Sequence, residues 1–279
     1  MLSYQHAYHA GNLADVHKHS ILLACLRSAT KIWPTMTYVE SHAGRGRYDL
    51  HAVEAEKTKE WRQGIAPLVA TDGLEGPLNH YKKFVMEFSK AKRARDLRWY
   101  PGSPAIARRV LRRTDRAILH DLHPQEFDAL HGGVGEDTRF ELRREDGLGG
   151  LQQLNDAQGD KVPTFALIDP SYENKGEFGL VLDRVKAVRQ LSAVMVWYPQ
   201  LTDDRHGALE KWLGEHAELS CFQFKALDPA ATAGTKMYGS GMGLMLNHVP
   251  NDLAKALRRQ MKLITKSLAV WRPSVSDDS

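Results

Sequence analysis

A chain of 279 residues with 42% hydrophobic and 26% charged side chains is long enough for a large α/β domain with a substantial core. Its two cysteines, Cys25 and Cys221, stand far apart in apolar surroundings, which excludes a disulfide framework and indicates a reducing compartment. No apolar run approaches membrane-spanning length, and residues 1–9 lack the basic-then-apolar pattern of a signal peptide. We therefore expect a cytoplasmic protein without membrane contact, and its net charge of +4 favours a polyanionic partner.

The first predicted helix follows an irregular polar segment at the N-terminus. Asp15 is expected to cap this helix, whose apolar side reaches about Ala29. Residues Met36 to Glu40 form the first predicted strand, which runs into a turn containing Gly44 and Gly46. Because glycine lets the backbone approach a ligand closely, this turn predicts a site for a nucleotide-like ligand.

Residues 51–98 show helical periodicity without a convincing strand. We therefore expect an inserted helical subdomain in an α/β domain formed by residues 1–50 and 99–279. The second half of the insertion carries seven cations between Lys82 and Arg98, interleaved with aromatic side chains. Such a run is often only a solvated helix face, but the aromatics favour a nucleic-acid surface. The cations singled out as RNA contacts are Lys92, Arg93 and Arg95.

Strand and helix patterns alternate again beyond residue 99, which predicts a doubly wound α/β sheet of about seven strands. Ser103 is expected to cap the next helix, with Pro104 at its first position. After the strand at 36–40, the predicted strands are 116–121, 138–142, 164–168, 193–198, 221–226 and 241–247, and a basic helix follows at 252–266.

Three strand ends predict a nucleoside cofactor that lies across one edge of this sheet. Gly44 lies in the turn after the first strand, and Asp121 ends the second with a carboxylate that suits ribose hydroxyls. Asp146 and Gly147 follow the third strand, where an adenine ring would lie. Asp49 stands where the dinucleotide fingerprint has its third glycine, which disfavours NAD.

The run Asp169-Pro170-Ser171-Tyr172 follows an uncharged apolar strand and favours chemistry on a planar amine. Asp169 and the carbonyl of Pro170 can accept the two N–H bonds of the amine, while Tyr172 stacks on its ring. Hydrogen bonds of this kind would make the nitrogen more nucleophilic, and Asp169 could take the released proton. Standing alone, the same run is typical of a surface Asp-Pro turn.

Histidines are frequent near the N-terminus, yet no metal site is predicted. His17 and His19 point to different sides of a helix, and no cysteine or carboxylate cluster completes a zinc site. We expect some of these histidines to line the cofactor pocket together with Lys18.

A set of short motifs is spread over most of the chain. They are Met1-Leu-Ser-Tyr4, His9-Ala-Gly-Asn12, Asp15, Lys18-His19, His42-Ala-Gly-x-Gly-x-Tyr48, Tyr100-Pro-Gly-Ser-Pro104, Leu122-His-Pro124, Asp146-Gly147, Asp169-Pro-x-Tyr172 and Trp197-Tyr-Pro199. Together they resemble the ribosomal RNA large subunit methyltransferase J family. The N-terminal segment and the Tyr-Pro-Gly-Ser-Pro run are the most specific, because amino-methyltransferases in general do not share them.

The resemblance implies a Rossmann-like class I methyltransferase, with a seven-stranded, mostly parallel sheet and an inserted helical subdomain. It implies that S-adenosylmethionine is used to form N6-methyladenine at one adenine of 23S ribosomal RNA. Asp169 would be the catalytic acceptor, acting with Pro170 and Tyr172, and Tyr4 would contact the RNA. The residues expected to hold the cofactor are His19, His42, Ser103, Asp121, Asp146, Gly147 and Asp169, to which the residue pattern adds Lys18 and Gly44.

This sequence departs from the family pattern at two positions. Ser171 replaces a second proline, which loosens the turn, and Asp121 replaces an expected glutamate that is one methylene longer. Alternatives are methylation of DNA adenine or of a protein amide, and a catalytically decayed RNA-binding or ribosome-assembly protein. The expected partner is 23S ribosomal RNA, either naked or in an early pre-ribosomal particle, and the expected state is a monomer.

Overall fold

The computed structural model describes residues 5–134, 137–157, 162–223 and 237–271. Within these ranges seven strands form one sheet in the order β5-β4-β1-β6-β7-β9-β8, and only β9 runs antiparallel to its neighbours. All seven predicted strands are present, so the predicted α/β fold with a mostly parallel sheet is confirmed. The strands are β1 (Thr37–Glu40), β4 (Arg116–His120), β5 (Phe140–Arg143), β6 (Thr164–Ile168), β7 (Ala193–Leu201), β8 (Glu218–Gln223) and β9 (Met237–Leu246).

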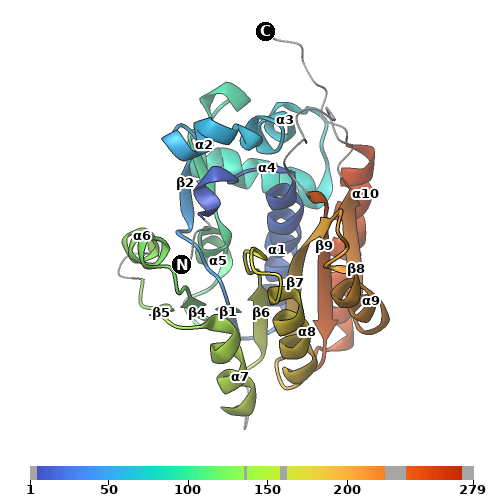
Figure 1. Cartoon of the computed structure of the whole chain (residues 1–279). Helices are drawn as coiled ribbons and strands as arrows, with labels where there is room; N and C mark the ends of the chain where they lie inside the picture. The colour runs from blue at the N-terminus through green and yellow to red at the C-terminus, as the bar shows by residue number, and fades with distance from the viewer. Residues whose placement is uncertain (1–4, 135–136, 158–161, 224–236, 272–279) are drawn as a thin grey trace.

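Helices cover both faces of the sheet because neighbouring side chains of each strand alternate between two hydrophobic clusters. In β1, Tyr38 packs into the first cluster and Val39 into the second. The first cluster receives α1 (Leu13–Ile32), α4 (Gly76–Ser89), α5 (Ser103–Val110), α6 (Pro124–Val134) and α10 (Asn251–Val270). The second receives α7 (Gly147–Ala157), α8 (Glu177–Ala187) and α9 (Gly207–His216) (Figure 1).

Residues 51–98 fold as a group of short helices at the upper end of the molecule in Figure 1. Buried side chains of this segment, including Leu68 and Tyr81, belong to the same hydrophobic cluster as those of α1. The insertion is therefore packed onto the common core. Besides α4, its elements are α2 (Val53–Thr58), η2 (Glu60–Arg62), α3 (Ile65–Ala70) and η3 (Ala94–Asp96).

A two-stranded ribbon, absent from the predicted elements, lies where the insertion joins the rest of the chain. Strands β2 (Arg47–Asp49) and β3 (Trp99–Pro101) pair antiparallel, with Tyr48 opposite Tyr100. Three residues are too few to show the alternation that identifies a strand in sequence. The ribbon joins the glycine turn after β1 directly to the turn before α5.

Both predicted helix caps are wrong. Helix α1 begins after Asn12, whose side chain accepts the backbone N–H of Asp15, so Asp15 lies inside the first turn. Helix α5 begins after Gly102, and Ser103 lies at its first position. The side chain of Asp15 instead pairs with His6 and Lys18, and the hydroxyl of Ser103 donates to Glu40.

Two further differences lie in the second half of the chain. Strand β7 continues through Pro199 to Leu201, because beyond Val196 it pairs only with β9 and a missing N–H is tolerated at such an edge. Helix α7 was not predicted, since Gly149 and Gly150 weaken its helical signal. Residues 224–226 of the predicted sixth strand lie outside the described ranges. Within those ranges no helix is both long and apolar enough to cross a membrane.

Candidate active site

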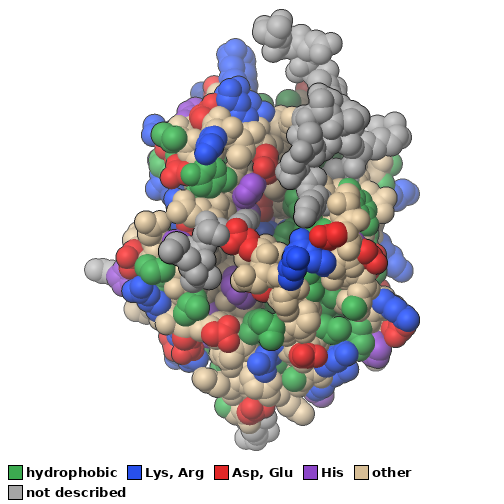
Figure 2. Space-filling view, in the orientation of Figure 1, with side chains coloured by type: hydrophobic (Ala, Val, Ile, Leu, Met, Phe, Trp, Pro, Cys, Tyr) green, Lys and Arg blue, Asp and Glu red, His purple; other side chains and the backbone are tan. Residues whose placement is uncertain are grey.

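The neighbouring strands β4, β1 and β6 bring three acids to one edge of the sheet. Glu40 is the last residue of β1, Asp121 follows β4 and Asp169 follows β6. Parallel strands end at the same edge, so the three carboxyl groups gather there. Figure 2 shows the surface hollowed below the insertion, with acidic and histidine side chains around the hollow.

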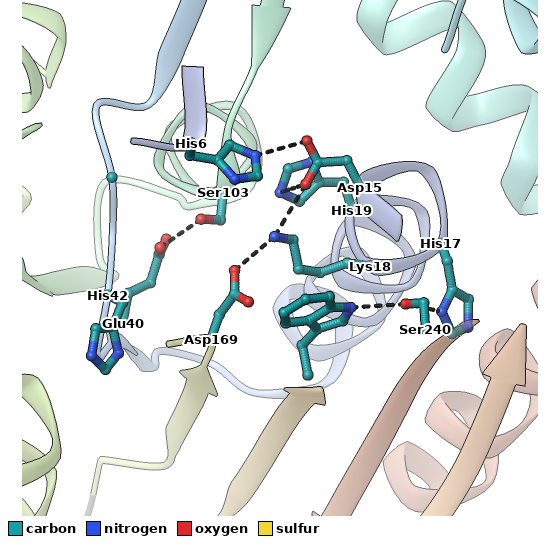
Figure 3. A network of polar contacts seen from close by, with 12 residues as sticks. His6, Asp15, His17, Lys18, His19, Glu40, His42, Ser103, Asp169 and Ser240 are labelled. Carbon is teal, nitrogen blue, oxygen red and sulfur yellow. Dashed lines mark hydrogen bonds and ion pairs between the residues drawn. The ribbon is translucent and has the colours of Figure 1, made fainter. Parts of the chain in front are cut away.

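Lys18 is the centre of a buried polar network at this edge (Figure 3). Its Nζ lies 2.7 Å from Oδ2 of Asp169 and 3.1 Å from Oδ1 of Asp15. His6 Nε2 lies 2.9 Å from Oδ2 of Asp15, which also accepts the backbone N–H of Gly11. The N-terminal segment, helix α1 and strand β6 are therefore tied together by charged groups.

Opposite charges hold this network together. Burial would lower the pKa of Lys18, but Asp169 and Asp15 outweigh burial and raise it, so the ammonium stays charged. Burial would raise the pKa of Asp15, but His6, Lys18 and His19 outweigh burial and hold it well below its usual range. Lys18 thus lies between the carboxylates of Asp15 and Asp169, and His6 also pairs with Asp15.

Glu40 is a site residue that the sequence analysis missed, although its strand-ending position is the same signal that marked Asp169. It is fully buried, and its Oε2 accepts a hydrogen bond of 2.6 Å from the hydroxyl of Ser103. Among the described residues its Oε1 makes no hydrogen bond of standard geometry, although the hydroxyl of Tyr38 is near enough to interact with the carboxyl. Burial raises the pKa of Glu40 to about 8, although the bond from Ser103 works against this shift, so the carboxyl is largely protonated at neutral pH.

The predicted ribose acceptor Asp121 holds the glycine turn in place. Its Oδ2 accepts the backbone N–H of Gly44 at 2.8 Å, and its Oδ1 accepts that of His123 at 2.8 Å. Gly44 adopts φ +63°, which L side chains rarely take. Burial raises the pKa of Asp121 against these two bonds. The shorter aspartate therefore reaches the loop backbone, and its contact with a ribose remains a prediction.

Asp146 and Gly147 lie at the N-terminus of α7. The carboxylate of Asp146 accepts the backbone N–H groups of Leu148 and Gly149 at 3.2 and 2.9 Å. A Cβ on Gly147 would lie 2.0 Å from the carbonyl oxygen of Ser41, so only glycine allows this turn to approach the end of β1. Contact of Asp146 and Gly147 with an adenine ring stays a prediction.

The two predicted histidines differ in their surroundings. His19 is buried, with Nδ1 2.8 Å from the hydroxyl of Tyr100, and burial lowers its pKa to about 3. His42 lies within the electrostatic reach of Asp169 and Asp146, although burial outweighs their effect and lowers its pKa. Both imidazoles are therefore neutral at pH 7, and His42 lies on the side of the site where the cofactor is predicted.

The predicted stacking residue Tyr172 is turned into the protein. Its ring is 3% exposed and stacks on Phe178 at 4.3 Å between centroids, while its hydroxyl donates to the carbonyl of Trp197 at 2.6 Å. Its backbone has φ +55°. No face of the ring is open to a base in this arrangement, so the stacking role is not met here and would need the turn after Asp169 to rearrange.

The predicted RNA contacts lie away from the network. Lys92 and Arg93 are exposed in the loop between α4 and η3, and Arg95 is 75% exposed in its side chain. The backbone N–H of Arg93 donates to Asp96 at 3.0 Å, which fixes the loop. Tyr4 lies outside the described residues. Those residues contain no cluster of three or more histidine, cysteine or acidic side chains arranged to hold a metal ion.

The sheet order and the site define the class of protein. The antiparallel β9 lies between β7 and β8, whereas a dinucleotide-binding fold would place the sixth strand beside the fifth. The two positive-φ glycines of the turn after β1 are accompanied by acids at the ends of β1, β4 and β6. This is a Rossmann-like class I methyltransferase.

Comparison with known proteins identifies the family. The family model described as "Ribosomal RNA large subunit methyltransferase D, RlmJ" matches residues 34–275, and the chain belongs to this family. It is 37% identical over 207 residues to ribosomal RNA large subunit methyltransferase J of Escherichia coli (strain K12), covering 71% of this chain and 70% of that protein. It is 35% identical over 206 residues to the protein of the same name from Haemophilus influenzae, with the same coverage.

Among solved structures, the chain is similar to protein LPL1258 from Legionella pneumophila. The TM-score is 0.74 at 27% identity, and the alignment covers 93% of this chain and 94% of that one. The architecture is therefore shared over nearly the whole length of both chains.

Proposed function

We propose that this protein transfers the methyl group of S-adenosylmethionine to the N6 amine of one adenine in 23S ribosomal RNA. The observation that carries the proposal is the environment of Asp169, in a chain that belongs to a ribosomal RNA methyltransferase family. The carboxylate follows the central strand β6, and Lys18 binds its Oδ2. Its Oδ1 has no hydrogen-bond partner among the described residues, so one acceptor remains for a substrate amine.

The residues around Asp169 suit S-adenosylmethionine, which when bound supplies an electrophilic methyl group on a cationic sulfonium. The carboxylate of Asp169, partly exposed beside Lys18, places a negative charge next to this position. The buried carboxyl of Glu40 lies at this edge, and its Oε1 makes no hydrogen bond of standard geometry within the described residues, so it can hydrogen-bond a polar group of the cofactor. The turn with Gly44 and the close approach at Gly147 leave backbone rather than side chains against the ligand.

In the proposed reaction Asp169 orients the amine and takes its proton. Its free Oδ1 and the carbonyl of Pro170 accept the two N–H bonds, which holds the nitrogen lone pair toward the methyl donor. Lys18 keeps the carboxylate in place through its 2.7 Å contact. After transfer, Asp169 accepts the proton that the nitrogen loses.

The RNA is proposed to approach from the insertion. The exposed cations Lys92, Arg93 and Arg95 are available to phosphates there, and the protein is proposed to act as a cytoplasmic monomer on naked RNA or on an early particle. The division into an α/β domain of residues 1–50 and 99–279 and a subdomain of residues 51–98 is retained in this proposal.

Labelled S-adenosylmethionine tests the proposal when it is incubated with the protein and with 23S RNA that lacks the modification. Digestion to nucleosides is expected to yield labelled N6-methyladenosine. Duplex DNA and protein extracts serve as competing acceptors, and preferential labelling of either would replace RNA as the substrate. Cofactor binding without label in RNA would point to another methyl acceptor or to a pre-ribosomal particle as the substrate. Absence of cofactor binding would favour a decayed RNA-binding protein.

A further inference from the structure

The outer face of the β2–β3 ribbon carries a stacked cation that the proposed chemistry does not use. Tyr48 and Tyr100 form a cross-strand pair, and the ring of Tyr48 lies 5.1 Å from that of His6, on the active-site side. Since side chains alternate along a strand, Arg47 and Trp99 lie on the opposite, outer side.

On this outer side the guanidinium of Arg47 lies over an aromatic ring. Its Cζ is 3.5 Å from the ring centroid of Trp99, and the Cζ of Arg98 is 5.1 Å from the same centroid. Arg98 is paired with Asp49 at 3.2 Å, whereas Arg47 is exposed and has no carboxylate partner in the described part of the chain. A planar cation is thus held in one place with its N–H groups open to solvent.

The ribbon is anchored firmly enough to fix this cation relative to the site. The hydroxyl of Ser89 at the end of α4 accepts the backbone N–H groups of Arg98 and Trp99 at 2.9 and 3.0 Å. On the other side, the backbone N–H of Gly102 donates to the carbonyl of Gly46 at 2.9 Å. Through Tyr48 and His6, the inner face of the same ribbon adjoins the Asp15–Lys18–Asp169 network.

We propose that Arg47 binds a backbone phosphate of the RNA strand that leads to the target adenine. Arginine presents planar donors that match phosphate oxygens, and stacking on an aromatic ring reduces the freedom it loses on binding. Trp99 is then a positioning residue that acts through Arg47. This inference rests on the proposed RNA substrate, and it assigns the ribbon as the surface that guides the strand from the basic loop at 90–98 to Asp169.

The test compares Arg47→Ala with Arg116→Ala, which removes an exposed arginine at the opposite edge of the sheet, the first residue of β4. With transcribed 23S RNA, Arg47→Ala is expected to raise KM for RNA about tenfold with little change in kcat. The slope of log K for RNA binding against log salt concentration should become shallower by about one, as expected for the loss of one phosphate contact. Arg116→Ala should match the wild type in both measurements.

Two further variants separate charge from position. Arg47→Lys keeps the positive charge that pairs with the phosphate. It should therefore keep the salt dependence, while KM rises because the planar donors are lost. Trp99→Leu should raise KM with the salt dependence unchanged, because the cation remains but is no longer held. Equal KM and salt dependence for Arg47→Ala and Arg116→Ala would overturn the inference. Absence of transfer by the wild type would instead contradict the proposed function, and direct RNA-binding titrations would still test Arg47.

Discussion

Lys18 lies between the buried carboxylate of Asp15 and the partly exposed carboxylate of Asp169, and its removal is predicted to damage both the fold and the reaction. Lys18→Met keeps most of the side-chain volume but leaves Asp15 and Asp169 without their shared counter-ion. Breaking a buried ion pair in this way costs about 3–5 kcal/mol. Urea unfolding should show a loss of this order, and kcat for methyl transfer should fall at least ~100-fold. Wild-type kcat in a folded Lys18→Met protein would show that Asp169 is positioned without it.

Glu40 makes stability depend on pH in a defined direction. Its pKa in the folded protein is about 8, against an ordinary value of 4.5, so the folded state holds the proton more strongly. The stabilisation is present below pH 4.5 and is lost as the pH rises through 8. Glu40→Gln, which resembles the protonated form, should therefore gain stability relative to the wild type between pH 5 and pH 8. The gain should be on the order of a few kcal/mol by chemical unfolding without cofactor. A difference that is constant over this range would contradict the assignment.

At this scale the sequence predicts site residues where a strand ends in an acid. Asp121 and Asp169 were predicted in this way and follow β4 and β6, and Glu40 carries the same signal. The pairing of Lys18 with Asp169 could not be predicted, because 151 positions separate them and only the packing of α1 on the sheet brings them together. The burial of Tyr172 depends on the conformation of a short turn, which a Pro-Ser-Tyr run does not determine.

The insertion and helix α1 meet backbone to backbone at Gly64. The backbone N–H of Ile65 donates to the carbonyl of Gly11 at 2.8 Å, and a Cβ on Gly64 would lie 2.1 Å from the same oxygen. Gly64→Ala is predicted to push the insertion away from the N-terminus of α1, where Asp15 binds His6. We expect a loss of about 1–3 kcal/mol in unfolding free energy together with reduced transfer.

The matched control is Gly179→Ala, because no atom lies within 4 Å of the added Cβ in helix α8. This variant is expected to be neutral or to stabilise the protein by up to about 1 kcal/mol. If both variants behave alike in urea unfolding, the close contact at Gly64 does not constrain the insertion.

Among elements, strands of the main sheet were predicted well because each is a short apolar run between turn signals. The ribbon was missed because it has no sequence pattern, and α7 was missed because its glycines disfavour a helix. Three-residue strands carry no pattern, and the glycines of α7 are tolerated in the helix because Gly150 packs against His120, where a Cβ would lie 2.3 Å from Nε2.

For the whole molecule, buried neutral histidines predict loss of stability in acid. Burial lowers the pKa of His17 and His19 to about 3, whereas the unfolded chain binds these protons near pH 6.5. Their contribution is present above pH 6.5 and is lost as the pH falls toward 3, at up to about 1.4 kcal/mol per pH unit for each histidine. His17→Gln should therefore flatten the dependence of unfolding free energy on pH between 6 and 4. An unchanged slope would show that His17 is not buried as a neutral group.

The insertion contributes to a single hydrophobic cluster with α1, α5 and α10. The cations proposed to bind RNA and the sheet edge that carries Asp169 therefore belong to one packed body. Sequence periodicity predicts where such an insertion begins and ends. It does not show that Leu68 and Tyr81 would share a core with the sheet helices, because that depends on contacts between distant segments.

The central claim is that Asp169 accepts the amine and its proton, and Asp169→Ala tests it most directly. The measurement is transfer of labelled methyl groups to 23S RNA, with cofactor affinity and thermal unfolding measured on the same preparation. We predict that labelled N6-methyladenosine falls at least ~1000-fold while the protein remains folded, since both the hydrogen bond and the proton acceptor are lost. Transfer at the wild-type rate by a folded Asp169→Ala protein would contradict the mechanism, whatever the identity of the methylated adenine.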